Sequence, residues 1–174
     1  MLFIPMKKYL LTALLVTTSL LPAQVLDIVE EEAKVTFHFV DDAVDGYFEG
    51  FSFVGHLNLS DLSNSILSGS VETNTIDTNN WLRSRHLRAK KYFNAKDFPK
   101  LTFKSISISG TKQSFRVDGT LEIKGIEKAV VWNFTNNGKK LEGTTTVNTT
   151  DFQIEIHNDR QRNKAVISIS LPYR

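Results

Sequence analysis

Residues 78–105 read TNNWLRSRHLRAKKYFNAKDFPKLTFKS and separate two regions of short alternating segments. Residues 78–80 are all good helix N-cap types, and residues 82–88 contain no helix breaker, so a short helix is expected here. In that helix Leu82 and His86 share one face. Asp97-Phe98-Pro99 then ends the helical segment and begins a strand. The stretch therefore predicts a helical crossover over about residues 79–95.

The chain on both sides of this crossover predicts β-strands. Residues 34–39 alternate, with Val35, Phe37 and Phe39 on one face. Residues 47–59 suggest one strand curved by its glycines, residues 151–156 suggest another, and Asn136-Asn137-Gly138 is a hairpin turn signal. About eight strands with one helical interruption predict an all-β sandwich or barrel. A barrel of this size is either filled by side chains or holds one small ligand.

The first 23 residues have the layout of a secretory signal peptide. Lys7 and Lys8 precede an uncharged run over residues 9–21, and Ala23 offers a small residue for cleavage. The run is short for a transmembrane helix, which needs about 20 apolar residues; an uncleaved N-terminal anchor is the alternative. We expect residues 1–23 to be removed after Ala23, and residues 24–174 to form one periplasmic or secreted domain without a stable membrane span.

Charge is distributed unevenly along the expected mature chain. Removing residues 1–23 leaves 19 basic and 19 acidic residues, so the formal net charge is zero. Residues 24–82 hold eleven acidic residues and one basic residue, whereas residues 83–104 hold eight basic residues and one acidic residue. Either the two regions neutralise each other across adjacent strands, or the basic region forms a rim that faces an anionic group.

No catalytic constellation is visible in the sequence. The chain has no cysteine, which excludes disulfides and thiolate chemistry. The four histidines are far apart and lack metal-ligand spacing, and no nucleophile-elbow context accompanies any serine. We expect no enzyme activity, no metal and no cofactor. The basic aromatic stretch resembles a nucleic-acid stripe, but the expected export argues against a nucleic-acid partner.

Several motifs recur along the chain between residues 46 and 125. The central ones are the Asn79-x-x-x-Arg83 spacing and His86-Leu87-Arg88. The set is completed by the aromatic pair Tyr92-Phe93, the run Phe98-Pro99-x-Leu101-Thr102-Phe103-Lys104-Ser105, the pattern Val117-x-Gly119-x-Leu121-x-Ile123-x-Gly125 and the upstream Gly46-x-Phe48. Together these motifs resemble the YceI family of polyisoprenoid-binding, lipocalin-like periplasmic proteins. The resemblance covers essentially residues 24–174. One departure is Ser84, which stands where the family has an aspartate after the arginine.

The resemblance implies an extended antiparallel lipocalin-like β-barrel that encloses an apolar channel. It also implies an isoprenoid ligand, of quinone or polyprenyl-phosphate type, or a similar amphiphile. The alternative is a filled, non-enzymatic structural barrel that acts through its surface, with Arg85, Lys90 and Lys91 as its contacts. Ligand chain length and oligomeric state, monomer or homodimer, stay open.

Two groups of side chains are candidates for binding such an amphiphile. The apolar candidates for the channel are Phe37, Phe39, Phe53, Leu57, Phe103, Phe115, Val117, Leu121, Phe134 and Ile154; each is equally a candidate for ordinary core packing. Arg83, His86 and Arg88 are candidates for a phosphate or quinone head group through charge-assisted hydrogen bonds. The competing reading is that these three side chains tie the helix to neighbouring carboxylates and carbonyls.

Overall fold

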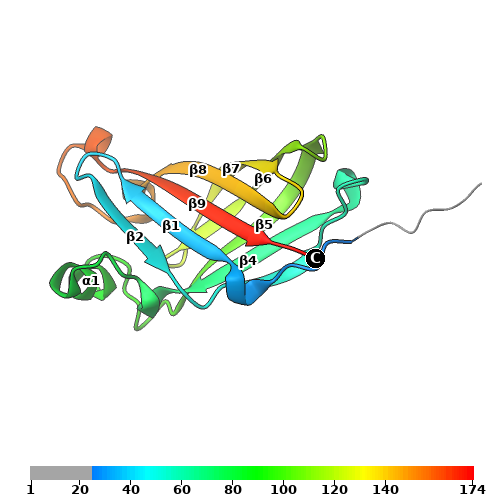
Figure 1. Ribbon diagram of the computed structural model, residues 1–174. Coiled ribbons are helices and arrows are strands. Elements are labelled where there is room, and N and C mark those ends of the chain that lie inside the picture. The colour runs from blue at the N-terminus through cyan, green and yellow to red at the C-terminus, as the bar shows by residue number, and fades with distance from the viewer. Residues whose placement is uncertain (1–24) are drawn as a thin grey trace, which may run out of the picture.

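The computed structural model describes residues 25–174, so the predicted signal peptide and its cleavage point lie outside the described residues. The described part forms one sheet and one α-helix (Figure 1). The strands are β1 Lys34–Phe39, β2 Val44–Phe48, β3 Ser52–His56, β4 Ile66–Glu72, β5 Lys100–Gly110, β6 Ser114–Ile123, β7 Ile126–Asn136, β8 Lys140–Asn148 and β9 Lys164–Pro172. Helix α1 is Trp81–Arg88, and short 3₁₀ turns lie at Glu30–Glu32, Leu62–Asn64, Thr73–Thr75, Thr149–Phe152 and Arg160–Arg162.

The strands pair in the order β2-β1-β9-β8-β7-β6-β5-β4-β3, and every pair is antiparallel. The sheet curls into a half-barrel (Figure 1). Its two edge strands, β2 and β3, are consecutive in the chain. The predicted all-β, antiparallel, lipocalin-like fold with one helical crossover is confirmed.

Two of the predicted strands differ from the observed ones. Residues 47–59 form the end of β2 and then β3, because the chain turns at Gly50, whose φ of +67° places it in the left-handed region. Residues 151–156 are not a strand; a 3₁₀ turn ends there at Gln153, which has a φ of +55°. The described residues contain nine strands, where about eight were predicted.

The core lies on the concave face, where the alternation of each strand places its apolar side chains. In β1 the predicted alternation is confirmed, with Val35, Phe37 and Phe39 all buried. Several phenylalanine rings lie over glycines of a neighbouring strand, as Phe37 does over Gly46 and Phe134 over Gly143. A methyl group at either glycine would overlap the ring, so these pairs let strands and aromatic rings approach closely.

Helix α1 begins close to the predicted position and ends at Arg88, several residues before the predicted end near residue 95. Asn80 is its N-cap and accepts a hydrogen bond from the Arg83 backbone N–H at 3.0 Å. The helix stops before Ala89, and turns rather than a second helix follow as far as residue 97. Phe93 anchors these turns to the core, because its ring is buried and contacts the Phe48 ring edge-on, with centroids 6.0 Å apart. Among residues 25–174, no helix is long and apolar enough to cross a membrane.

Candidate functional site

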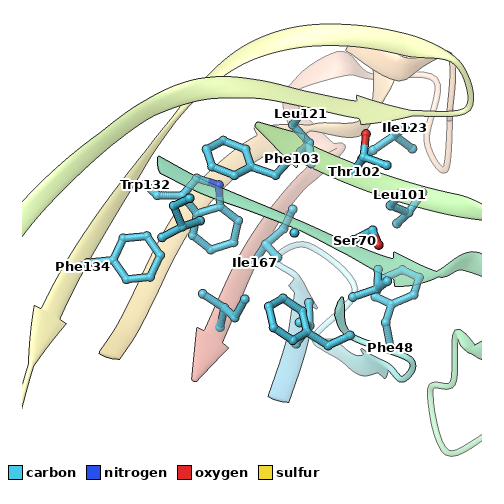
Figure 2. Close-up of a pocket in the computed structure, with 16 residues that line it drawn as sticks. Phe48, Ser70, Leu101, Thr102, Phe103, Leu121, Ile123, Trp132, Phe134 and Ile167 are labelled. Carbon is cyan, nitrogen blue, oxygen red and sulfur yellow. The ribbon is translucent and has the colours of Figure 1, made fainter. Parts of the chain in front are cut away.

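The concave face of the sheet holds an apolar cavity of about 80 Å³ (Figure 2). Its wall comes from β1, β2, β4, β5, β6, β7, β9 and the loop after β2. The lining residues are Val35, Phe48, Phe51, Leu67, Gly69, Ser70, Val71, Leu101, Thr102, Phe103, Leu121, Ile123, Trp132, Phe134, Ile167 and Ile169. No charged residue belongs to this set, so the cavity suits hydrocarbon.

One polar atom in this wall lacks a hydrogen-bond partner. The Nε1 of Trp132 is buried and bonds to no other atom of the described residues. The indole contacts the Phe103 ring at 6.1 Å between centroids and 68° between planes, and Figure 2 shows the nitrogen on the side toward Phe103. An N–H over an aromatic face gains only a weak interaction. This buried donor therefore has no conventional hydrogen bond among the described residues.

The structure distributes the ten predicted channel residues over several environments. Phe103, Leu121 and Phe134 line the cavity. Phe53 is half-buried on the edge strand β3. The remaining six are buried in the core around the cavity and do not line it: Phe37, Phe39, Leu57, Phe115, Val117 and Ile154. Whether any of the ten contacts a ligand stays a prediction.

Most residues of the cavity wall were not among the predicted channel residues. Trp132, Ile123, Ile167 and Ile169 each lie two residues from another inward-facing apolar residue of the same strand. Strict alternation along β6, β7 and β9 would have found them. Phe51 belongs to a loop, although alternation along the predicted strand over residues 47–59 placed it on the same face as Phe53 and Leu57.

The predicted head-group residues lie near a separate depression of about 410 Å³ beside α1. Arg83 and His86 line this depression together with Leu82, whereas Arg88 does not. None of its lining residues is shared with the cavity. The full set is Phe39, Asp42, Val44, Asn80, Leu82, Arg83, His86, Leu87, Tyr92 and Ile156.

Both arginines of the predicted head-group set bond to the chain itself. Arg83 donates from Nε to the Thr78 hydroxyl at 2.9 Å and from Nη2 to the Thr78 carbonyl at 2.8 Å. Arg88 donates from Nη1 to the Ile76 carbonyl at 3.0 Å. These bonds tie α1 to the segment that joins it to the 3₁₀ turn at Thr73–Thr75. One terminal nitrogen of each guanidinium has no partner within the described residues, so a head-group role stays a prediction.

A row of phenylalanine rings lies between the depression and the cavity. The Phe39 ring, which lines the depression, is 5.1 Å from the Phe37 ring. The Phe37 ring is in turn 5.4 Å from the ring of Phe48, which lines the cavity. A continuous row of three aromatic rings thus runs from the depression to the cavity.

Within residues 25–174, no group of three histidine, aspartate or glutamate side chains could hold a metal ion. Three of the histidines have individual partners instead. His38 pairs with Asp45 at 2.8 Å, His157 pairs with Asp42 at 2.9 Å, and His56 meets the Asn64 carbonyl at 2.6 Å.

A curled antiparallel half-barrel with one apolar cavity defines a class of small container proteins, and comparison with known proteins identifies the family. The model of the YceI-like domain matches residues 26–171, so the chain belongs to the YceI-like family. The UPF0312 protein plu2095 of Photorhabdus laumondii is 35% identical over 51 residues, a segment that spans 29% of this chain and 27% of that protein.

Solved structures share the fold. Burkholderia cenocepacia BcnA has a TM-score of 0.74 at 20% identity, covering 83% of this chain and 98% of its own. The Campylobacter jejuni YceI protein has a TM-score of 0.66 at 20% identity, covering 75% and 85%. A polyisoprenoid binding domain from Saccharophagus degradans, implicated in plant cell wall breakdown, has a TM-score of 0.58 at 13% identity, covering 87% and 98%.

Proposed function

We propose that this protein is an exported, non-enzymatic binding protein that carries or sequesters an isoprenoid, of quinone or polyprenyl-phosphate type, or a similar amphiphile. It would act in the periplasm or outside the cell after removal of residues 1–23. Membership of the YceI-like family and the fold shared with a polyisoprenoid binding domain support this proposal. The observation that carries it is the uncharged cavity on the concave face of the sheet.

The cavity offers a hydrocarbon chain a favourable environment. Each methylene group that leaves water for such a wall contributes about 0.8 kcal/mol.

The cavity volume of about 80 Å³ is below the range of about 300–1,000 Å³ that is usual for ligand pockets. A long chain therefore needs more room. We propose that Phe37 and Phe48 rotate aside and join the cavity to the depression beside α1. The chain would then occupy the cavity, while the head group meets His86 and the unpaired nitrogen of Arg83 in the depression.

The two tryptophans allow a direct test, because Trp132 lines the cavity and Trp81 is exposed. In Trp81→Phe protein, all tryptophan emission comes from Trp132. Adding farnesol or geranylgeraniol should change this emission saturably. Ile167→Phe, which enlarges a side chain in the cavity wall, should weaken binding about ten-fold or more. Ile66→Phe makes the same change at an exposed site on β4 and should leave binding unaltered.

Protein purified from its own host provides the second measurement. Native mass spectrometry should show a bound mass, and lipid extraction should identify it as an isoprenoid or related amphiphile. The proposal would be overturned if the purified protein carried no ligand and its Trp132 emission did not change with any added isoprenoid. That result would favour the filled barrel that acts through its surface.

A further inference from the structure

The first turn of α1 exposes two large apolar side chains beside basic ones. Trp81 is 72% exposed and Leu82 is 47% exposed. Arg85 lies four residues after Trp81 and three after Leu82, so the three side chains are neighbours on the outer side of the helix. Exposed Lys90 and Lys91 follow in the next turn. These five residues are called the α1 surface below, and Figure 1 shows α1 at one end of the half-barrel.

Most basic side chains between positions 83 and 104 are not paired with a carboxylate of the described residues. Among the described residues, only Lys100 of the eight basic residues between positions 83 and 104 has a carboxylate partner, Glu72 at 3.7 Å. The expected neutralisation by the acidic N-terminal region is thus limited to one pair there. Arg83 and Arg88 bond to backbone carbonyls, whereas Arg85, Lys90 and Lys91 have no carboxylate partner within residues 25–174. Their charges are available to an external anion.

We propose that the α1 surface docks the protein onto an anionic lipid bilayer. Tryptophan favours the headgroup level of a membrane, and Leu82 beside it can enter the boundary with the acyl chains. Lysine and arginine near an anionic surface each strengthen binding. An acidic protein or a nucleic acid would also meet the charges, but it would give no comparable partner to an exposed leucine next to an exposed tryptophan.

Docking at this place would put the membrane beside the ligand entrance. Leu82 belongs both to the α1 surface and to the depression that Arg83 and His86 line. A lipid leaving the bilayer would therefore meet the depression first and the row of phenylalanine rings next. The transfer of a lipid from the bilayer to the depression rests on the proposed function. Docking to the bilayer can be measured without any ligand.

The test uses Trp132→Phe protein, in which Trp81 is the one tryptophan. Vesicles of phosphatidylcholine mixed with phosphatidylglycerol should shift the Trp81 emission to shorter wavelength and should co-sediment with the protein. Vesicles of pure phosphatidylcholine should do neither, and added salt should reverse the binding because it screens exposed charges. Equal binding to both kinds of vesicle, or to neither, would overturn the proposal.

Matched variants separate the α1 surface from general charge and general apolar exposure. The triple change Arg85→Gln, Lys90→Gln and Lys91→Gln should weaken vesicle binding by about ten-fold to a hundred-fold. The same charge is removed by Lys34→Gln, Lys112→Gln and Lys139→Gln, which change exposed lysines in β1 and in two hairpin turns. That control should bind vesicles nearly as the parent does, and an equal loss in both triples would overturn the proposal.

The apolar part has its own pair of variants. Leu82→Ser should weaken vesicle binding clearly, whereas Ile106→Ser should not, although Ile106 on β5 is 75% exposed.

Isoprenoid binding is measured separately, through the Trp132 emission in the Trp81→Phe background. The triple change Arg85→Gln, Lys90→Gln and Lys91→Gln should leave it unchanged. Vesicle binding without isoprenoid binding would support docking and contradict the proposed function. Isoprenoid binding without vesicle binding would support the proposed function and contradict docking.

Discussion

The ring of Phe103 on β5 lies over Gly119 on β6, so closely that a methyl group on Gly119 would overlap it. The same methyl group would overlap the backbone carbonyl of Lys104. Phe103 in turn lines the apolar cavity and contacts the indole of Trp132. Position 119 therefore determines how far the Phe103 ring stands from the sheet.

We expect Gly119→Ala to destabilise the protein by about 1–3 kcal/mol, as overpacking of a dense core does. The backbone oxygen of Lys104 cannot move aside as a flexible side chain would. Urea denaturation of the variant and the parent measures the difference in free energy of unfolding. Gly69→Ala is the matched control, because its new methyl group would meet the half-buried Phe51 ring at 3.0 Å. A loss in Gly69→Ala as large as that in Gly119→Ala would contradict this explanation.

Ser84 stands where the resemblance to the family leads us to expect an aspartate, and its surroundings in the structure suit a serine. Its side chain is 1% exposed and accepts a hydrogen bond from the Thr78 backbone N–H at 2.9 Å. The Asp77 carboxylate lies 3.5 Å from the Ser84 hydroxyl. Asn80 already caps α1. A carboxylate is thus present beside position 84, although it comes from another residue.

We expect Ser84→Ala to cost about 1–3 kcal/mol, because the buried N–H of Thr78 loses its acceptor. Ser63→Ala, at an exposed serine, should change the free energy of unfolding by less than about 0.5 kcal/mol. Ser84→Asp should also be destabilising at neutral pH, because it places two carboxylates side by side. Adding Asp77→Asn should recover part of that loss. If Ser84→Asp proves as stable as the parent, the like-charge argument is wrong.

Asp118 on β6 forms an exposed pair with Arg116 that gives a measurable titration. The guanidinium donates to the carboxylate, with Nη2 and Oδ1 2.6 Å apart, and this hydrogen bond holds the pKa of Asp118 below its ordinary value. A lowered folded-state pKa favours folding above the unfolded pKa of about 3.9, and this contribution is lost as the pH falls through the folded pKa. Acidification should therefore remove it.

An NMR titration of the side-chain carboxyl carbons should show the Asp118 pKa rising toward its ordinary value in Arg116→Met. Asp61 is the internal control. Hydrogen bonds from Asn64 and Ser63 lower its pKa, and neither residue contacts Arg116. An unchanged Asp118 pKa in the variant, or an equal shift at Asp61, would be evidence against the pairing.

The local signals in the sequence were strong where neighbours along the chain decide the structure. Asn80 and Pro99 bound the helical crossover, since capping and the loss of a backbone N–H act within a few residues. The alternation of Val35, Phe37 and Phe39 identified a buried face, because successive side chains of a strand point to opposite sides. Gly50 turned a predicted single strand into two, which alternation alone does not reveal.

Chain order and residue type were thus sufficient for an all-β fold with a helical crossover, and the motifs around residues 79–105 added the antiparallel form through the resemblance to the YceI family. Only the tertiary structure decided which inward-facing side chains border the cavity. Phe115 and Phe134 face each other across β6 and β7 and stack at 5.2 Å, yet only Phe134 lines the cavity. The difference depends on how the whole sheet curls, and that curl results from pairing between strands far apart in the chain, such as β1 and β9.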